Sequence, residues 1–121
     1  MGRDHEEKEK DMRPVKKAAE MSVRELARYV DQSVLKPEFT VEEVRRYTQE
    51  GIDFGCATIC INPASLPVVA PMVDGSSTGI CVVCDFPFGL ATTEAKALLA
   101  EEYCSKWGVQ DLDIVANYGW L

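Results

Sequence analysis

Three near-continuous apolar runs recur along the chain, at residues 57–62, 79–84 and 112–116. Runs of this length and composition are typical of strands that are buried on both faces. A shorter candidate strand, residues 32–35, precedes them and ends at Pro37. The pattern therefore predicts four strands.

Helical signals separate these strands. Ser22 with Glu25, and Thr40 with Glu43, have the spacing of a capping box, in which a hydroxyl and a glutamate satisfy free N–H groups at a helix start. Apolar positions then recur at helical spacing: Leu26, Tyr29 and Val30 in the first segment, and Val41, Val44 and Tyr47 in the second. The spacing predicts that each set shares one helix face.

Two further helices are predicted, one after Pro63 and one from Thr92 to Gly108. A strand followed by a helix, repeated three times before a last strand, indicates parallel strands joined by crossover helices. A doubly wound sheet and a (β/α)8 barrel both have this order. The order alone does not separate these two α/β folds.

Composition narrows the function classes. The chain has a formal net charge of -7 and a pI near 4.7, which argues against a nucleic-acid partner. No apolar run is long enough for a membrane span, and the charged start lacks the apolar core of a signal peptide. We expect a cytoplasmic protein with a solvated tail at residues 1–20, which contains the single histidine His5, and one folded domain at residues 21–121.

The five cysteines raise the question of zinc. Cys56 and Cys60, like Cys81 and Cys84, resemble the paired spacing of a structural zinc site. Within a strand, however, residues three apart point to opposite faces, so Cys81 and Cys84 cannot bind one ion. We expect buried free thiols, with no metal and no disulfide.

Asp113 is the most informative polar residue, because it interrupts an apolar strand run between Leu112 and Ile114. A buried carboxylate is costly unless a partner compensates it. Asp113 could cap a neighbouring backbone group near the strand start. It could equally be a titrating group that lines a site, where pKa values are commonly shifted.

Five blocks of the sequence resemble, in order and spacing, motifs of one enzyme family. The blocks are DQSVLKP at 31–37, ATICINP at 57–63, VVCDFPFG at 82–89, TTEAK at 92–96 and LDIVANYG at 112–119. The matching motifs of deoxyribose-phosphate aldolases are D-H-T-x-L-K-P, C-V-N-P, V-V-G-F-P-L-G, T-T-E-x-K and I-D-M-V-I-N-x-G. The resemblance extends over about residues 25–121.

The resemblance implies a TIM (β/α)8 barrel, of which this chain would form the N-terminal half with strands 1–4. It implies class I aldol cleavage of 2-deoxy-D-ribose 5-phosphate to D-glyceraldehyde 3-phosphate and acetaldehyde, through a Schiff base and without a cofactor or metal. Asp113 matches the catalytic aspartate that handles protons. Cys60, Asp31 and Ser33 match residues near the substrate. The expected partners are a phosphorylated sugar and further copies of the chain in a homo-oligomer.

The sequence also departs from the family. Gln32 and Ser33 replace the usual histidine and threonine, and Asp85 adds a carboxylate after the third strand at a usual glycine. In the family, the Schiff-base lysine and its helper lie on the sixth and seventh strands, which we expect to fall beyond Leu121. Lys36 is the only lysine near the end of a predicted strand.

Three alternatives remain open at this point: a truncated aldolase, a shortened and inactive family member that acts as a binding or assembly module, and a small zinc protein.

Overall fold

The computed structural model describes residues 13–121 of the chain. Of the predicted tail, residues 13–20 are exposed and contain one short 3-10 turn, η1 (Ala18–Glu20). His5 lies outside the described residues.

Four parallel strands form one sheet in sequence order: β1 (Asp31–Val34), β2 (Thr58–Ile61), β3 (Gly79–Cys84) and β4 (Asp111–Ile114). Three helices connect successive strands: α2 (Val41–Phe54), α3 (Leu66–Val73) and α4 (Thr93–Trp107). The remaining elements are α1 (Val23–Ala27) before β1, and the 3-10 turns η2 (Pro63–Ser65) and η3 (Tyr118–Trp120). The predicted strand-helix order and the parallel pairing are confirmed.

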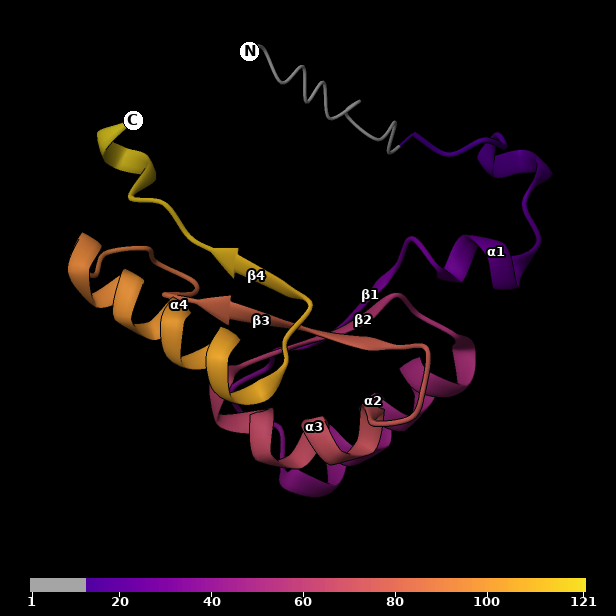
Figure 1. The fold of residues 1–121 in the computed structure, drawn as a ribbon, viewed down its shortest axis with the longest axis horizontal. Coiled ribbons are helices and arrows are strands. Elements are labelled where there is room, and N and C mark those ends of the chain that lie inside the picture. The colour runs from indigo at the N-terminus through magenta and orange to yellow at the C-terminus, as the bar shows by residue number, and fades with distance from the viewer. Residues whose placement is uncertain (1–12) are drawn as a thin grey trace, which may run out of the picture.

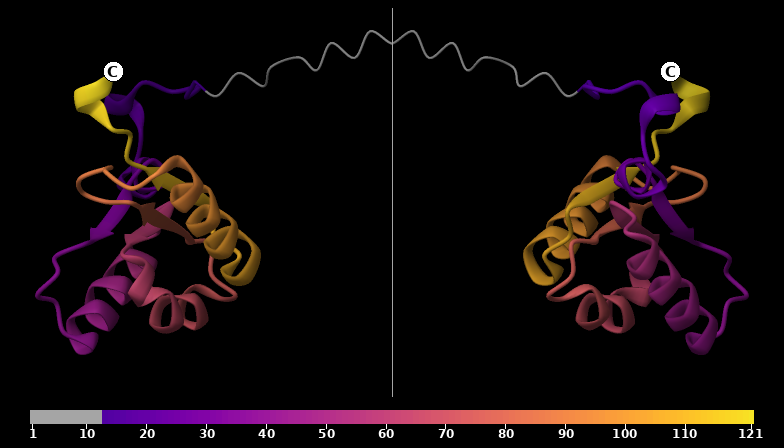
Figure 2. Two further views of the ribbon diagram at one scale, coloured as in Figure 1. Left: turned by 90° about the vertical axis from the view of Figure 1, so that its left-hand side faces the viewer. Right: turned by 90° about the vertical axis from the view of Figure 1, so that its right-hand side faces the viewer.

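The three connecting helices lie on one side of the sheet and leave the other side without a covering layer (Figure 1; Figure 2). Alternate strand residues divide between these two sides. The larger core is on the helix side and includes the strand residues Val34, Ile59, Ile61, Ile80 and Val82. A smaller cluster of Cys60, Cys81 and Val83 lies on the other side. The sheet therefore has one fully packed face and one open face.

The capping box predicted at Thr40 and Glu43 forms in full, whereas the one predicted at Ser22 and Glu25 forms only its N-cap hydrogen bond. The Thr40 hydroxyl accepts a hydrogen bond from the Glu43 N–H at 3.2 Å, and the Glu43 carboxylate accepts one from the Thr40 N–H at 2.7 Å. The Ser22 hydroxyl likewise accepts a hydrogen bond from the Glu25 N–H at 3.1 Å. Local hydrogen bonding thus fixes where α1 and α2 begin.

The helix at α1 is shorter than expected, and it ends at Ala27, so Tyr29 and Val30 of the set predicted to share one helix face lie beyond it. Leu26, Tyr29 and Val30 are 43%, 58% and 40% exposed, whereas Ala27 is buried. The reason is that α1 lies at the amino ends of the strands rather than on the helix side. Arg28 anchors it there by donating hydrogen bonds to the carbonyls of Gly55, Cys56 and Ser77. These three apolar side chains therefore remain exposed to solvent in the part of the chain that the structure describes.

Candidate functional site

The open face of the sheet displays polar side chains in register. Ser33 of β1 pairs with Cys60 of β2, which in turn pairs with Cys81 of β3. Further along, Asp111 of β4 pairs with Cys81, and Asp113 pairs with Val83. Because side chains alternate along a strand, these residues all project from the face that the connecting helices do not cover. This face is where chemistry could occur.

Three side chains converge on it. One ligand atom each from Cys60, Cys81 and Asp113 lies within 4.8 Å of the other two. The two thiols are buried, whereas Asp113 is exposed to solvent. The three residues come from the neighbouring strands β2, β3 and β4. The cluster is therefore produced by the register of the sheet and not by the spacing of these residues in the sequence.

Both thiols of this cluster are held in their neutral form. Burial raises the pKa of Cys60, and the nearby Asp113 and Asp31 carboxylates raise it further, although a hydrogen bond with Cys81 opposes them. Burial also raises the pKa of Cys81, and the neighbouring Cys60 and Asp113 add to the effect. Since the thiolate is the nucleophilic form, neither cysteine is activated for attack.

The four residues that the sequence indicated occupy different levels of this face. Cys60 and Asp113 are brought together, and Ser33 lies beside Cys60 in the register. Asp31 is the first residue of β1, nearer the amino ends of the strands. Its carboxylate accepts a hydrogen bond from the Thr58 hydroxyl at 2.8 Å. The roles of these residues toward a substrate stay predictions.

The structure adds Cys81, which the sequence reasoning did not place in the site. That reasoning compared cysteines within one strand, and Cys81 and Cys84 do lie on opposite faces. Cys81 joins the open-face cluster, whereas the Cys84 Sγ lies 3.8 Å from the Lys96 carbonyl of α4. The signal for the pairing of Cys60 with Cys81 is the register between two strands, which the local pattern does not contain.

Asp85 is held by a lysine at the carboxyl end of the sheet. Its carboxylate lies 3.5 Å from the Lys96 ammonium and accepts a hydrogen bond from the Ala91 N–H at 2.9 Å. Lys96 also donates hydrogen bonds to the carbonyls of Gly89 and Val115, both at 2.9 Å. These contacts fix the loop between β3 and α4 against the segment after β4.

The backbone conformation of Asp85 agrees with the interpretation that this residue stands where the resembling motif has glycine. This residue has a φ of 58°, a left-handed conformation that glycine adopts freely and aspartate tolerates. The contacts of Lys96 also correct the expectation that Lys36 is the only lysine near a strand end. Lys96, on α4, reaches the carboxyl ends of β3 and β4 from the side.

Removing the Lys96 ammonium should destabilise the fold. We expect Lys96→Met to lower the free energy of unfolding by about 2–3 kcal/mol, because it leaves two carbonyls without this donor and the largely buried Asp85 carboxylate without its counter-ion. Lys106→Met is the matched control on the same helix, since its pair with Glu102 is exposed and should contribute less than about 0.5 kcal/mol. Urea unfolding measures both, and equal effects would contradict the assigned role of Lys96.

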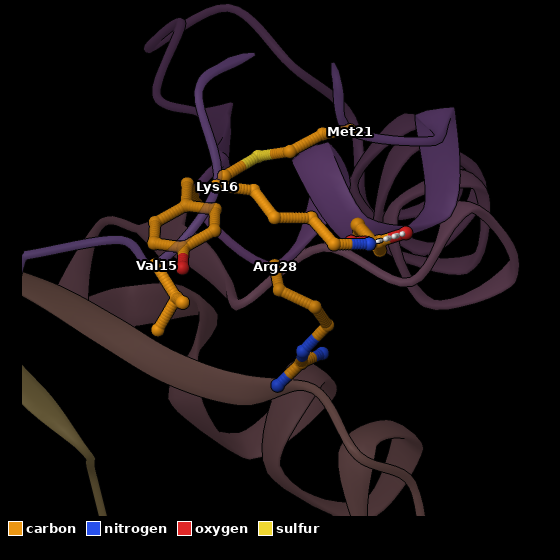
Figure 3. Close-up of a pocket in the computed structure, with 6 residues that line it drawn as sticks. Val15, Lys16, Met21 and Arg28 are labelled. Carbon is orange, nitrogen blue, oxygen red and sulfur yellow. Dashed lines mark hydrogen bonds and ion pairs between the residues drawn. The ribbon is translucent and has the colours of Figure 1, made fainter.

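Two hollows lie away from the cluster. One, of about 320 Å³, lies between α1 and the segment before it, and its lining includes Val15, Lys16, Met21 and Arg28 (Figure 3). It contains none of the predicted site residues. Another, of about 590 Å³, lies at the carboxyl end of β4, between the start of α4 and the segment after β4, and its lining includes Leu90, Lys96, Ile114 and Trp120. Ile114, Leu90 and Trp120 are each more than half exposed, so apolar surface borders this hollow.

The chain is similar in sequence to curated deoxyribose-phosphate aldolases. It is 35% identical over 101 residues to the one from Clostridium kluyveri, which covers 84% of this chain and 46% of that protein. It is 33% identical over 102 residues to the one from Caldanaerobacter subterraneus, covering 84% of this chain and 44% of that protein. The chain thus spans slightly less than half the length of these relatives. No family model matches it.

Solved structures agree with the sequence comparison. A candidate deoxyribose-phosphate aldolase from Coccidioides immitis superposes with a TM-score of 0.76 at 26% identity, covering 83% of this chain and 39% of that one. The deoxyribose phosphate aldolase from Aeropyrum pernix superposes with a TM-score of 0.74 at 27% identity, covering 82% of this chain and 42% of that one. Among residues 13–121, no helix combines the length and hydrophobicity that a membrane crossing requires.

The sequence comparison and the structure comparison both find deoxyribose-phosphate aldolases. The matched part is a parallel sheet of four strands alternating with helices. On this evidence, the chain is related to the deoxyribose-phosphate aldolases over slightly less than half of their length.

Proposed function

We propose that the chain supplies the first four β/α units, and the proton-handling aspartate, of a class I deoxyribose-phosphate aldolase. The reaction is the reversible cleavage of 2-deoxy-D-ribose 5-phosphate to D-glyceraldehyde 3-phosphate and acetaldehyde. The observation that supports this most strongly is the position of Asp113 beside Cys60 on the open face of the parallel sheet, within the family's fourth-strand and second-strand blocks. In barrels of this kind, the carboxyl ends of the strands and the loops that follow them form the active site.

In this proposal Asp113 accepts and returns protons through a water molecule while the substrate is held as an iminium on a lysine. An iminium is itself an electron sink, so the reaction needs no metal or cofactor. Cys60 and Cys81 line the site as neutral thiols, because burial raises the pKa of both. Ser33 and Asp31 border the sugar on the β1 side.

The nucleophilic lysine has to come from outside the described residues. None of the four strands contains a lysine. Lys96 is engaged by two carbonyls and Asp85, and Lys36 is exposed, with its ammonium 5.8 Å from the centre of the Phe39 ring. We therefore propose that residues 1–121 alone are catalytically inactive and that a second set of β/α units completes the site.

A chimera tests the proposal. The chain is fused to the part of the Clostridium kluyveri relative that lies beyond its matched segment, and turnover of 2-deoxyribose 5-phosphate is measured with a coupled assay. We expect measurable turnover by the chimera and none by either part alone. A folded chimera without turnover would contradict the proposed function.

The alternative function is a binding or assembly module without aldolase activity. Two features favour it: the strands lack lysine, and the open face and open edges offer pairing surface to another chain. An inactive chimera, together with a stable complex formed by the chain alone, would favour this alternative.

The isolated chain should self-associate. The edge strands β1 and β4 each have unpaired backbone groups on one side, and Ile114 of β4 is 52% exposed. Open edges with apolar neighbours recruit other strands, so we expect a dimer or larger species at micromolar concentration. Sedimentation velocity measures this, and a monomer with a cooperative melt would contradict it. The related protein from Aeropyrum pernix is described as tetrameric, which agrees with a homo-oligomer.

A further inference from the structure

The cluster of Cys60, Cys81 and Asp113 has a chemistry that the aldolase proposal does not use. It combines two thiols and one carboxylate, and among residues 13–121 it is the one group of three or more potential metal ligands found this close together. Aldol cleavage through an iminium requires none of these atoms to bind a metal. The cluster therefore raises a separate question of ligand binding.

The geometry suits a single small cation. With zinc–sulfur bonds of about 2.3 Å and zinc–oxygen bonds of about 2.0–2.2 Å, the ligand atoms of a tetrahedral site lie roughly 3.3–3.8 Å apart. The three atoms here lie within 4.8 Å of one another before any ion draws them together. Asp113 is exposed, so its carboxylate has room to move toward the two buried thiols.

The ligand set selects the kind of ion. Sulfur ligands favour soft or borderline cations, whereas Mg²⁺ and Ca²⁺ prefer oxygen. Three protein ligands leave the fourth position of a tetrahedral ion free, as in sites that keep a bound water. Asp113 is on the solvent side, so this fourth position is accessible to water.

We propose that Cys60, Cys81 and Asp113 form a binding site for one thiophilic divalent cation, such as Zn²⁺, which binds the two cysteines as thiolates and releases their two protons to water. This trio differs from the pairs considered from the sequence, because its members come from three strands. An ion bound there occupies the carboxylate of Asp113. If the proposed aldolase function holds, the ion therefore inhibits catalysis, and that consequence alone rests on the proposed function.

Cobalt reports binding without any reference to activity. The reduced chain is titrated with Co²⁺, and thiolate-to-cobalt charge-transfer absorbance is recorded, followed by displacement with Zn²⁺. We expect saturation at one equivalent. Cys60→Ser and Cys81→Ser should each weaken binding at least about tenfold, which is 1.4 kcal/mol, and reduce the charge-transfer band. Asp113→Asn should weaken binding while the band at saturation remains.

The other cysteines provide matched controls. Cys84→Ser alters a buried thiol on the helix side, and Cys104→Ser alters an exposed thiol on α4, so neither should change the titration. Circular dichroism verifies that each variant folds. If a cluster variant does not fold, alkylation of the unmodified chain is mapped by mass spectrometry, and Zn²⁺ should slow modification of Cys60 and Cys81 but not of Cys104.

Three results would overturn the site: no charge-transfer band, a band that is lost with Cys84→Ser or Cys104→Ser, or a native Cys60–Cys81 disulfide that persists in reductant. Because none of these readouts depends on turnover, failure of the cation site leaves the aldolase proposal intact. Failure of the chimera likewise leaves the cation site intact.

Discussion

Borohydride treatment of the 121-residue chain with acetaldehyde or 2-deoxyribose 5-phosphate should trap no lysine adduct. An ordinary lysine amine, with a pKa of about 10.4, is almost wholly protonated at neutral pH. Activation requires burial or a neighbouring cation. Lys96 is instead held by a carboxylate and two carbonyls, and Lys36 is exposed to solvent.

Peptide mass mapping after reduction measures this directly. The Clostridium kluyveri relative, treated in the same way, is the positive control for trapping. An adduct on Lys36 together with turnover that disappears in Lys36→Ala would show that the chain contains its own nucleophile. That result would refute the division of the active site between two sets of β/α units.

In the active chimera, Asp113→Asn should lower kcat/KM by about 10²–10⁴, the usual scale for the loss of a positioned acid–base group. Asparagine preserves the shape and polarity of the side chain but cannot accept a proton. The decrease should appear mainly in kcat, because proton transfer belongs to the chemical steps and not to substrate binding.

Asp111→Asn is the matched control for this substitution. Asp111 is an exposed carboxylate on the same face of β4, two residues closer to the strand start, and it pairs with Cys81 in the register. Its replacement should change kcat/KM by less than about threefold, since it is not placed in the proton path. Equal effects of the two substitutions would remove Asp113 from its assigned role.

The elements of this fold follow from local sequence signals. The apolar run at 79–84 coincides with β3, and Thr40 with Glu43 forms the capping box that starts α2. Gly108, in a left-handed conformation, ends α4 where the sequence predicts. Each of these depends on neighbouring residues only, which is why the pattern alone was sufficient.

The site was predictable only in part, because it depends on relations between strands. Asp113 and Cys60 were identified through the family blocks, but the addition of Cys81 depends on the register between β2 and β3. The role of Lys96 depends on the left-handed conformation of Asp85, which turns that carboxylate toward α4. The exposure of Leu26 follows from the position of α1 at the amino ends of the strands, which its own periodicity does not specify.

The central claim is that this chain supplies half of an aldolase site, with Asp113 but without the nucleophile. The most direct measurement is borohydride trapping of the chimera with 2-deoxyribose 5-phosphate, followed by peptide mapping of the adduct. We predict that the adduct lies on a lysine of the appended segment and that its yield depends on residues 1–121 being present. An adduct on a lysine within residues 1–121, or the same yield from the appended segment alone, would contradict the claim.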